Sequence, residues 1–168
     1  MIYLIGFTGV GKTTIGKQLA LQNNINFIDT DKEIEKATKK TISNVFSENG
    51  EHYFRMIETK VLKNIKGKNI VSCGGGLPVF NNNMKYIKRY GTSIYLKASP
   101  SEIFNRLSDN IEHRPLIKKK PKEELKKFIQ KKITEREKFY LMANYILNTN
   151  DLTENEVLRK INALPFPL

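Results

Sequence analysis

A glycine-rich segment near the beginning of the sequence has the residue types and spacing of a phosphate-binding loop. Residues Gly6–Thr13 match the pattern Gly-x-x-x-x-Gly-Lys-Ser/Thr, between an apolar run and an amphipathic stretch. Glycines let successive backbone N–H groups point inward and form a nest for phosphate oxygens at the positive end of a helix. Lys12 can then reach the β- and γ-phosphates, and the Thr13 hydroxyl can bind Mg²⁺. Glycine-rich turns also occur by chance, but this context favours a nucleoside triphosphate site.

Two carboxylates, Asp29 and Asp31, follow the next apolar run. In a parallel α/β sheet, ligands bind beyond the carboxyl ends of the strands, on the side where the phosphate loop also lies. Asp29 is therefore a candidate Mg²⁺ ligand. Asp31 is a candidate for holding or deprotonating a substrate hydroxyl. The alternative for Asp31 is a purely structural one, in which it caps the helix that follows.

Two further patterns lie in the middle of the chain. Arg55 and Glu58 are three residues apart on one predicted helical face, and taken alone this spacing favours a surface salt bridge. Gly74, Gly75 and Gly76 follow an apolar strand pattern. Three consecutive glycines cost backbone entropy, so we expect another group to approach that backbone closely.

The second half of the chain carries two arginines that could act on anionic groups. Residues 109–122 have neither helical nor strand periodicity, and a long irregular segment in a compact domain is usually a functional loop or lid. Arg114 lies in this segment, where a mobile arginine could close over a transferring phosphoryl group. Arg136 and Tyr140 lie four residues apart on the basic helix predicted next. Without the other motifs, both arginines would read equally well as solvated side chains.

The elements that must position these residues alternate between short β-rich runs and longer amphipathic stretches, which is typical of an α/β domain with a parallel sheet covered on both faces. The predicted strands are Ile2–Ile5, Asn26–Ile28, Asn69–Cys73, Ser93–Leu96 and Asn144–Leu147. The predicted helices are Lys12–Gln22, Lys32–Thr38, Glu51–Ile65 and Lys122–Tyr140. Two more helices are expected where capping boxes occur, at Ser99 with Glu102 and at Thr153 with Glu156.

Length and composition set limits on the class of protein. With 168 residues, 39% hydrophobic and 27% charged, the chain fits one globular domain. No apolar run approaches the roughly 20 residues that cross a bilayer. Cys73 is the only cysteine, so an internal disulfide and a cysteine-based zinc site are excluded, and a reducing cytoplasm is expected.

The net charge of +12 is concentrated in one region. From residue 114 to residue 138 there are two arginines and nine lysines against four glutamates. We interpret this region mainly as a solvated helix face beside a phosphate-handling loop, and the alternative is a patch that binds a polyanion.

Taken in order, these motifs resemble the shikimate kinases, small P-loop enzymes of the nucleoside-monophosphate-kinase-like group. The resemblance runs from Ile2 to about Asn148, nearly the whole chain. The phosphate loop alone indicates only a nucleoside triphosphatase. The remaining motifs make the resemblance specific: the Asp29–Asp31 pair, Phe54-Arg55 with Glu58, Gly74–Gly76, Arg114-Pro115-Leu116, and Arg136 with Tyr140.

The resemblance implies a role for each candidate residue. Asp31, Arg55, Gly75 and Arg136 would bind shikimate, and Asp31 would accept the proton of its 3-hydroxyl. Glu58 would hold Arg55 in place. Lys12, Asp31 and Arg114 would be catalytic, and Thr13 and Asp29 would bind Mg²⁺. The ATP-binding set would be Gly9, Val10, Gly11, Lys12, Thr13, Thr14, Arg106 and Arg114.

The chain departs from the family pattern at the adenine end of the site. Arg106, the candidate adenine contact, precedes Arg114 by eight positions, whereas family members tend to have seven. Residues Asn148–Asp151 stand where many members carry arginine or proline near adenine.

The resemblance also implies the architecture and the cellular role. It implies one kinase domain over residues 1–168, with a five-stranded parallel sheet of order 2-3-1-4-5 between helical layers. A substrate-binding helical segment would span about residues 31–60 and a lid about residues 109–122. The enzyme would act as a cytoplasmic monomer that transfers the γ-phosphoryl group of ATP to shikimate, on the route to chorismate and the aromatic amino acids, without nucleic-acid or membrane partners.

Two alternatives remain at this point. A gluconate- or nucleotide-kinase-like acceptor is the nearest rival. Arg55 and Arg136 favour an acceptor with a carboxylate, which two guanidiniums can bind by paired N–H bonds. A nucleotide-gated module that grips a polyanion through the lysine-rich helix is the second, and it predicts association that weakens steeply with salt.

Overall fold

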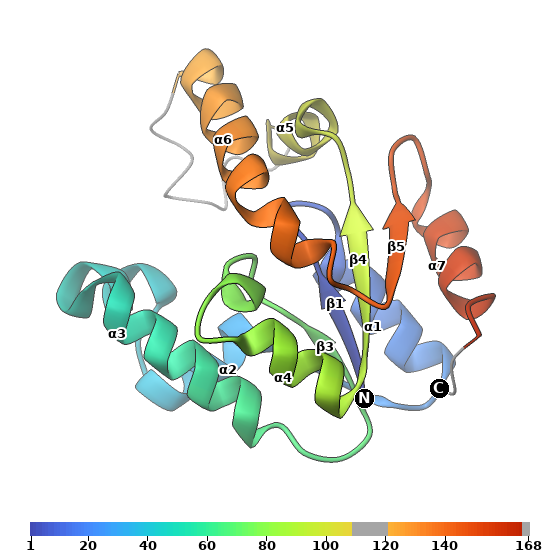
Figure 1. The fold of residues 1–168 in the computed structure, drawn as a ribbon, viewed down its shortest axis with the longest axis horizontal. Coiled ribbons are helices and arrows are strands. Elements are labelled where there is room, and N and C mark those ends of the chain that lie inside the picture. The colour runs from blue at the N-terminus through green and yellow to red at the C-terminus, as the bar shows by residue number, and fades with distance from the viewer. Residues whose placement is uncertain (109–120, 166–168) are drawn as a thin grey trace.

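The centre of the molecule is a parallel sheet whose five strands follow the order β2-β3-β1-β4-β5, as expected (Figure 1). A computed structural model describes residues 1–108 and 121–165. The strands are β1 (Ile2–Ile5), β2 (Asn26–Asp29), β3 (Asn69–Ser72), β4 (Thr92–Lys97) and β5 (Tyr145–Asn148). Each predicted strand is present, with ends that differ by one residue at most.

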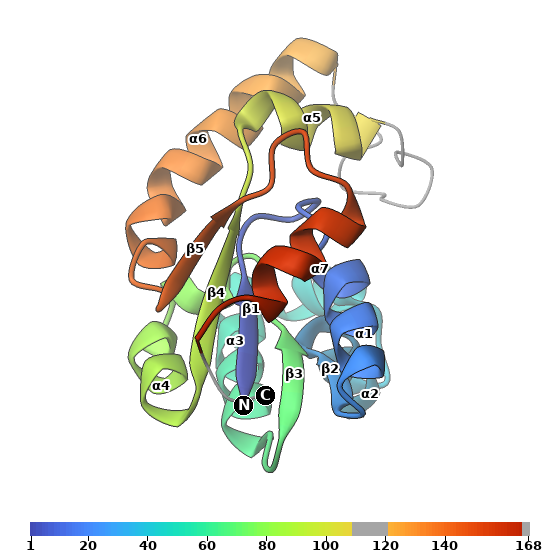
Figure 2. The same cartoon turned by 90° about the vertical axis from the view of Figure 1, so that its right-hand side faces the viewer.

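Alternating residues of the central strand β1 divide the core into two layers. Ile2 and Leu4 pack with apolar residues of α1 (Lys12–Gln22) and α7 (Glu154–Asn162). Tyr3 and Ile5 pack on the other face with residues of α3 (Ile42–Asn64) and α4 (Asn83–Tyr90). Figure 2 shows α1 and α7 on one side of the sheet and α3 and α4 on the other. Such burial on both faces is what parallel strands require, and it confirms the three-layer α/β architecture.

The remaining helices connect the layers around the carboxyl ends of the strands. They are α2 (Thr30–Thr38), the short 3₁₀ helix η1 (Leu77–Val79), α5 (Pro100–Ser108) and α6 (Lys122–Tyr140). The predicted bounds of α1 and α6 are confirmed. The irregular segment expected as a lid lies almost entirely outside the described residues, because residues 109–120 are not among them.

Two parts of the helical structure differ from the sequence prediction. Helix α3 begins at Ile42 rather than at residue 51, and Gly50, with φ of 79°, kinks it at the point where the predicted helix starts. Helix α4 and the 3₁₀ turn were not predicted. Both follow the glycine run. Helix α4 has only two turns, which is too short for its apolar periodicity to stand out in the sequence.

One of the two predicted capping boxes forms completely. The Thr153 hydroxyl accepts from the Glu156 backbone N–H, and the Glu156 carboxylate accepts from the Thr153 backbone N–H. At Ser99 only half of the box is present, because the Glu102 carboxylate accepts from Arg106 instead of from the Ser99 backbone. The prediction of a reciprocal box at Ser99 was therefore wrong.

The described helices include none that is long and apolar enough to cross a membrane.

Candidate active site

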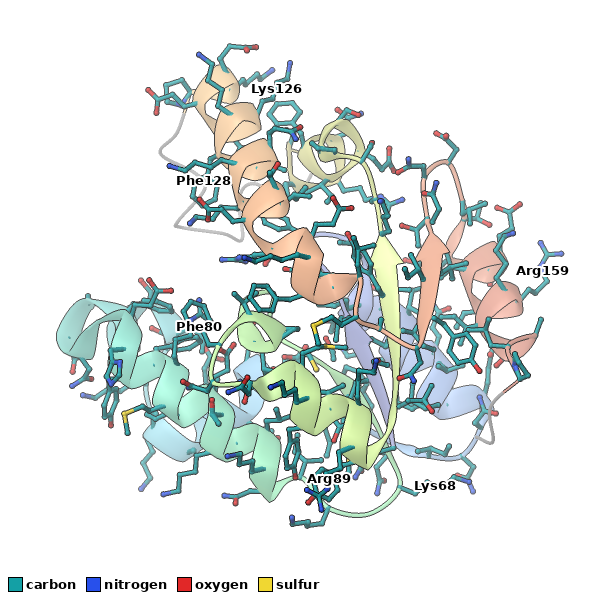
Figure 3. The ribbon with its side chains drawn as sticks, viewed as in Figure 1. Lys68, Phe80, Arg89, Lys126, Phe128 and Arg159 are labelled. Atoms are coloured by element: carbon teal, nitrogen blue, oxygen red, sulfur yellow. The ribbon has the colours of Figure 1, made fainter. Side chains whose placement is uncertain are left out.

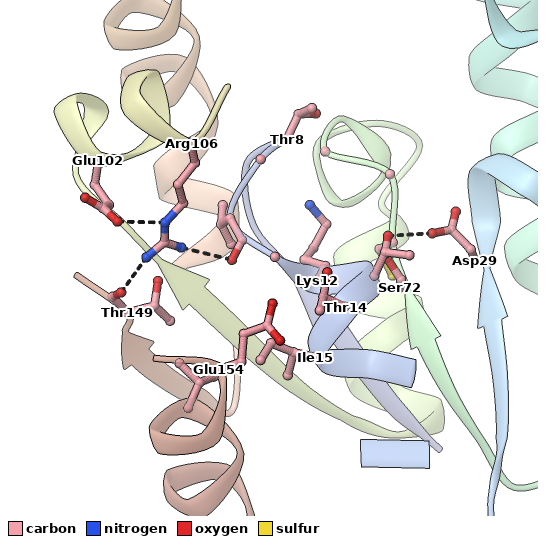
Figure 4. A pocket seen from close by; sticks show the side chains of 18 of the residues that line it. Thr8, Lys12, Thr14, Ile15, Asp29, Ser72, Glu102, Arg106, Thr149 and Glu154 are labelled. Carbon is pink, nitrogen blue, oxygen red and sulfur yellow. Dashed lines mark hydrogen bonds and ion pairs between the residues drawn. The ribbon is translucent and has the colours of Figure 1, made fainter. Parts of the chain in front are cut away.

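A cavity of about 750 Å³ lies at the carboxyl ends of the strands, where the phosphate loop meets the segments that follow β2, β3 and β5 (Figure 4). This volume is within the range of small-molecule sites, which is about 300–1,000 Å³. The lining contains Thr8–Ile15, Asp29, Asp31, Ser72–Gly75, Glu102, Arg106, Thr149, Leu152–Glu154 and Val157. Most of the residues expected to bind ATP and metal are among them.

The phosphate loop connects β1 directly to α1. At Gly9 the backbone has φ of 94°, and a Cβ atom there would lie 2.8 Å from the Leu107 side chain, so a larger residue would be both strained and crowded. Lys12 is buried, and its Nζ donates to the carbonyls of Gly6 and Phe7 at 3.0 and 2.9 Å. Backbone carbonyls of the loop thus bind the ammonium group of Lys12, which is among the residues that line the cavity.

Three oxygen-bearing side chains meet beside the first turn of α1. The Thr13 hydroxyl donates to Asp29 Oδ2 at 2.8 Å and lies 3.4 Å from the Ser72 hydroxyl. Asp29 Oδ1 also accepts from the Asp31 backbone N–H and so forms the N-cap of α2. The structural alternative in which Asp31 caps this helix is therefore wrong, and the Asp31 side chain is left for the cavity.

The turn Gly74–Gly76 lies at the centre of the expected acceptor site. A Cβ atom on Gly74 would lie 2.6 Å from Asp31 Oδ1 and 2.9 Å from Glu58 Oε1. One on Gly76 would lie 2.5 Å from Arg55 Nη1. The close approach expected of the three glycines is thus made by two carboxylates and a guanidinium, which any side chain on the turn would displace.

Arg136 reaches the same turn from α6, and the phosphate loop borders it. Arg136 Nη1 would lie 3.5 Å from a Cβ atom on Gly75, and the Thr8 hydroxyl 3.1 Å from it. Tyr140, which is buried, donates its hydroxyl to the Gly75 carbonyl. The structure therefore brings Asp31, Arg55 and Arg136 together around one backbone turn beside the loop that carries Lys12.

Arg55 and Glu58 form a buried pair, not the surface salt bridge that their spacing favours. Arg55 Nη1 donates to Glu58 Oε2 at 2.7 Å, and Glu58 is 1% exposed. Arg55 Nη2 also donates to Glu51 Oε1 at 3.1 Å, a contact that the sequence analysis missed. The interpretation as a surface pair was wrong because it depends on which helical face packs against the sheet, and local spacing does not reveal that.

Burial changes the proton affinity of both carboxyl groups at the turn. Burial, and then the nearby Asp29 carboxylate, raise the pKa of Asp31, while Lys12 and Arg55 oppose the rise. Burial raises the pKa of Glu58 to about 7 against the pull of Arg55. A carboxylate with a raised pKa binds a proton more readily than an ordinary carboxylate does.

The part of the cavity expected to take the adenine contains Arg106. Its Nη2 donates to the Thr149 carbonyl at 2.8 Å, its Nη1 to the Val10 carbonyl at 3.4 Å, and its Nε to Glu102 at 2.7 Å (Figure 4). Thr14 also lines the cavity. Thr149 lies in the segment Asn148–Asp151, which the sequence analysis placed near adenine, whereas Leu152 was missed, although its position just after β5 is the signal that could have identified it.

Cys73 is buried beside the glycine turn, and burial raises the pKa of its thiol, which favours the thiol over the reactive thiolate. Arg114 lies outside the described residues.

The sequence and the fold were compared with those of known proteins. The family model described as shikimate kinase matches residues 8–164. A curated shikimate kinase of Azobacteroides pseudotrichonymphae is 44% identical over 163 residues, which cover 95% of this chain and 96% of that protein.

Solved structures give the same result. A shikimate kinase from Bacteroides thetaiotaomicron superposes with a TM-score of 0.91 and 36% identity over 96% of this chain and 95% of that one. A shikimate kinase from Acinetobacter baumannii in complex with shikimate superposes with a TM-score of 0.86 and 32% identity, over 96% of this chain and 89% of that one.

Proposed function

The chain belongs to the shikimate kinase family, and from this premise we propose how its residues perform the family's reaction. The enzyme is an ATP-dependent kinase that transfers the γ-phosphoryl group to the 3-hydroxyl of shikimate and yields shikimate 3-phosphate and ADP. The observation that carries the residue assignment is the convergence of Asp31, Arg55 and Arg136 on the turn Gly74–Gly76.

The acceptor would lie between this turn and the phosphate loop. Arg55 and Arg136 bind its carboxylate, because guanidiniums donate paired N–H bonds to carboxylates. Asp31 and the backbone of Gly75 bind its hydroxyl groups. Glu58 keeps the Arg55 guanidinium in place through the 2.7 Å ion pair. An acceptor without a carboxylate, such as a sugar alcohol, would lack the anionic group that Arg55 and Arg136 are proposed to bind.

Transfer then needs alignment and charge stabilisation more than covalent chemistry by the protein. The 3-hydroxyl oxygen attacks the γ-phosphorus, its proton passes to Asp31, and the bond to the bridging oxygen of ADP breaks. Lys12 stabilises the charge that develops on the phosphoryl oxygens. The phosphates are held by Gly9, Val10, Gly11, Thr13 and Thr14. Arg106 lies where the adenine would bind, and Arg114 completes the proposed ATP-binding set.

Mg²⁺ fits the oxygen donors of this site. Thr13 and Asp29 would hold it, with the Ser72 hydroxyl nearby, and hard oxygen ligands are those that Mg²⁺ prefers. The cation would be held by one or two protein ligands and by the nucleotide phosphates, whose charge it would neutralise.

We also propose one kinase domain that works as a cytoplasmic monomer on small molecules, without nucleic-acid or membrane partners. The α6 lysines bear only on the nucleic-acid part of this proposal: Lys126 and Lys132 form ion pairs with Glu123 and Glu135 on the same helix, so carboxylates are interspersed with the lysines there.

The proposed reaction is tested by incubating the purified protein with ATP, Mg²⁺ and a panel of acceptors: shikimate, gluconate and a nucleoside monophosphate. ADP release and the mass of the product are measured. We expect shikimate alone to raise ADP release and to gain one phosphoryl group. ADP release at the same rate with and without shikimate would contradict the proposal.

Replacing Arg136 by lysine tests the carboxylate site. Lysine keeps the charge but loses the planar fork, so we expect the KM for shikimate to rise about 10- to 100-fold, as for loss of a hydrogen bond to a charged group. The KM for ATP should stay unchanged. Arg159→Lys, on α7, is the matched control. An equal rise in both KM values would argue against carboxylate binding by Arg136.

A further inference from the structure

A group of side chains behind the acceptor site binds the backbone of Arg55, and none of its members is among the residues that line the cavity. Asn81 Nδ2 donates to the Arg55 carbonyl at 3.3 Å and to the Thr59 hydroxyl at 2.9 Å. The Thr59 hydroxyl in turn donates to the Arg55 carbonyl at 2.9 Å. The carbonyl of Arg55, the arginine expected to bind a carboxylate, lies within helix α3 and accepts hydrogen bonds from two side chains.

Asn83 ties the same hydroxyl to the far end of the glycine turn. Its Nδ2 donates to Thr59 Oγ1 at 3.1 Å and to the Leu77 carbonyl at 3.0 Å. Leu77 begins η1 directly after Gly76 and bonds to the Gly74 carbonyl through its own N–H. Two elements far apart in sequence, α3 and the glycine turn, are therefore joined through one threonine hydroxyl that is 9% exposed.

Phe80 places the same segment against the other end of Arg55. The Arg55 guanidinium lies 4.4 Å from the centroid of the Phe80 ring, nearer than to the rings of Phe54 and Phe46 at 5.1 and 5.9 Å. Figure 3 shows Phe80 beside α3, in the loop that leads to α4. A guanidinium over an aromatic face is stabilised by the ring quadrupole and is restricted in orientation.

Two consecutive asparagines of this segment have positive φ. Asn81 and Asn82 have φ of 51° and 55°, in the left-handed region, which asparagine adopts more readily than most other non-glycine residues. The Asn81 side chain makes the two hydrogen bonds given above, whereas the Asn82 side chain makes no capping hydrogen bond at the start of α4. The two positions thus share a backbone conformation and differ in their side-chain contacts.

We propose that Thr59, Phe80, Asn81 and Asn83 form a clamp that positions Arg55 against the glycine turn and thereby sets the affinity for the acceptor's carboxylate. These are positioning residues that act through Arg55 and do not touch the substrate. The inference rests on the proposed role of Arg55 in binding shikimate.

The matched pair Asn81→Gly and Asn82→Gly tests the clamp. Glycine accepts positive φ at both positions and loosens the unfolded chain equally, so the backbone contribution to the change in stability should be similar in the two variants. Only Asn81→Gly removes bonds to Arg55 and Thr59. We expect it to raise the KM for shikimate about tenfold, the effect of two modest hydrogen bonds, with kcat and the KM for ATP unchanged. Asn82→Gly should resemble the wild type.

Thr59→Val and Thr59→Ser provide a second matched pair of variants, for the case in which other contacts replace the hydrogen bonds lost with Asn81. Valine removes the shared hydroxyl at constant shape and should raise the KM for shikimate, and serine should restore it. A variant that loses kcat or melting temperature while its KM for shikimate stays at the wild-type value would overturn the clamp. An equal KM for shikimate in Asn81→Gly and Asn82→Gly would also overturn the clamp.

Failure of the clamp can be separated from failure of the proposed function. The NMR signal of the Arg55 Nε–H group reports the order of the guanidinium without any substrate. We expect a sharp signal in the wild type and in Asn82→Gly, and a broadened or shifted one in Asn81→Gly. A wild type that ignores shikimate refutes the function, while an Arg55 signal that is identical in all three proteins refutes the clamp.

Discussion

Replacing Asp31 by asparagine is expected to lower kcat about 10²- to 10⁴-fold, the usual contribution of a positioned general base. Asparagine has the same shape and can still bind near Gly74, but it cannot take the proton of the acceptor hydroxyl. The KM for ATP should change little, because Asp31 lies on the acceptor side of the cavity beside the glycine turn. Steady-state kinetics with each substrate varied in turn measures both effects.

The pH profile adds a second readout for Asp31. The pKa of Asp31 is raised by burial and by the Asp29 carboxylate, and only the ionised form can accept a proton. The wild-type kcat/KM for shikimate should therefore fall as the pH falls through this raised pKa, and Asp31→Asn should lose that limb. Glu33→Gln, the same change of charge on the same helix, is the control. A kcat within tenfold of the wild type would show that Asp31 only orients the substrate.

Replacing Lys12 by methionine is expected to lower kcat about 10²- to 10³-fold, as for loss of one preorganised donor to developing charge. Methionine keeps most of the length of the side chain but cannot donate to phosphoryl oxygens. It also removes the bonds from Nζ to the Gly6 and Phe7 carbonyls, so the loop itself loses two internal contacts. Single-turnover phosphoryl transfer from ATP at saturating shikimate isolates the chemical step.

The control for Lys12 is Lys17→Met, an exposed lysine on the same helix α1. It should leave kcat unchanged. The melting temperature of Lys12→Met with and without ATP separates nucleotide binding from catalysis, because the loop's backbone N–H groups should still bind phosphate. A variant that transfers phosphoryl groups at the wild-type rate would remove Lys12 from the catalytic set.

The outline of the fold could be predicted because it depends on local patterns. Alternating apolar runs identified all five strands, and a helix as long as α6 shows its periodicity clearly. The first half of α3 was not predicted because Gly50 breaks the helical pattern there. Helix α4 was not predicted because a helix of two turns has few periodic positions. The strand order came from the family resemblance rather than from periodicity.

What the sequence determined by itself is the phosphate loop, because its chemistry needs only neighbouring glycines, a lysine and a threonine between a strand and a helix. The tertiary structure alone decided which distant side chains meet. Arg55 and Arg136 reach one glycine turn only after α3 and α6 have packed against the sheet. Burial of the Arg55–Glu58 pair, and its binding by Asn81, likewise depend on the packed face of α3. Contacts and desolvation are set by packing over long chain separations, and local residue spacing does not encode them.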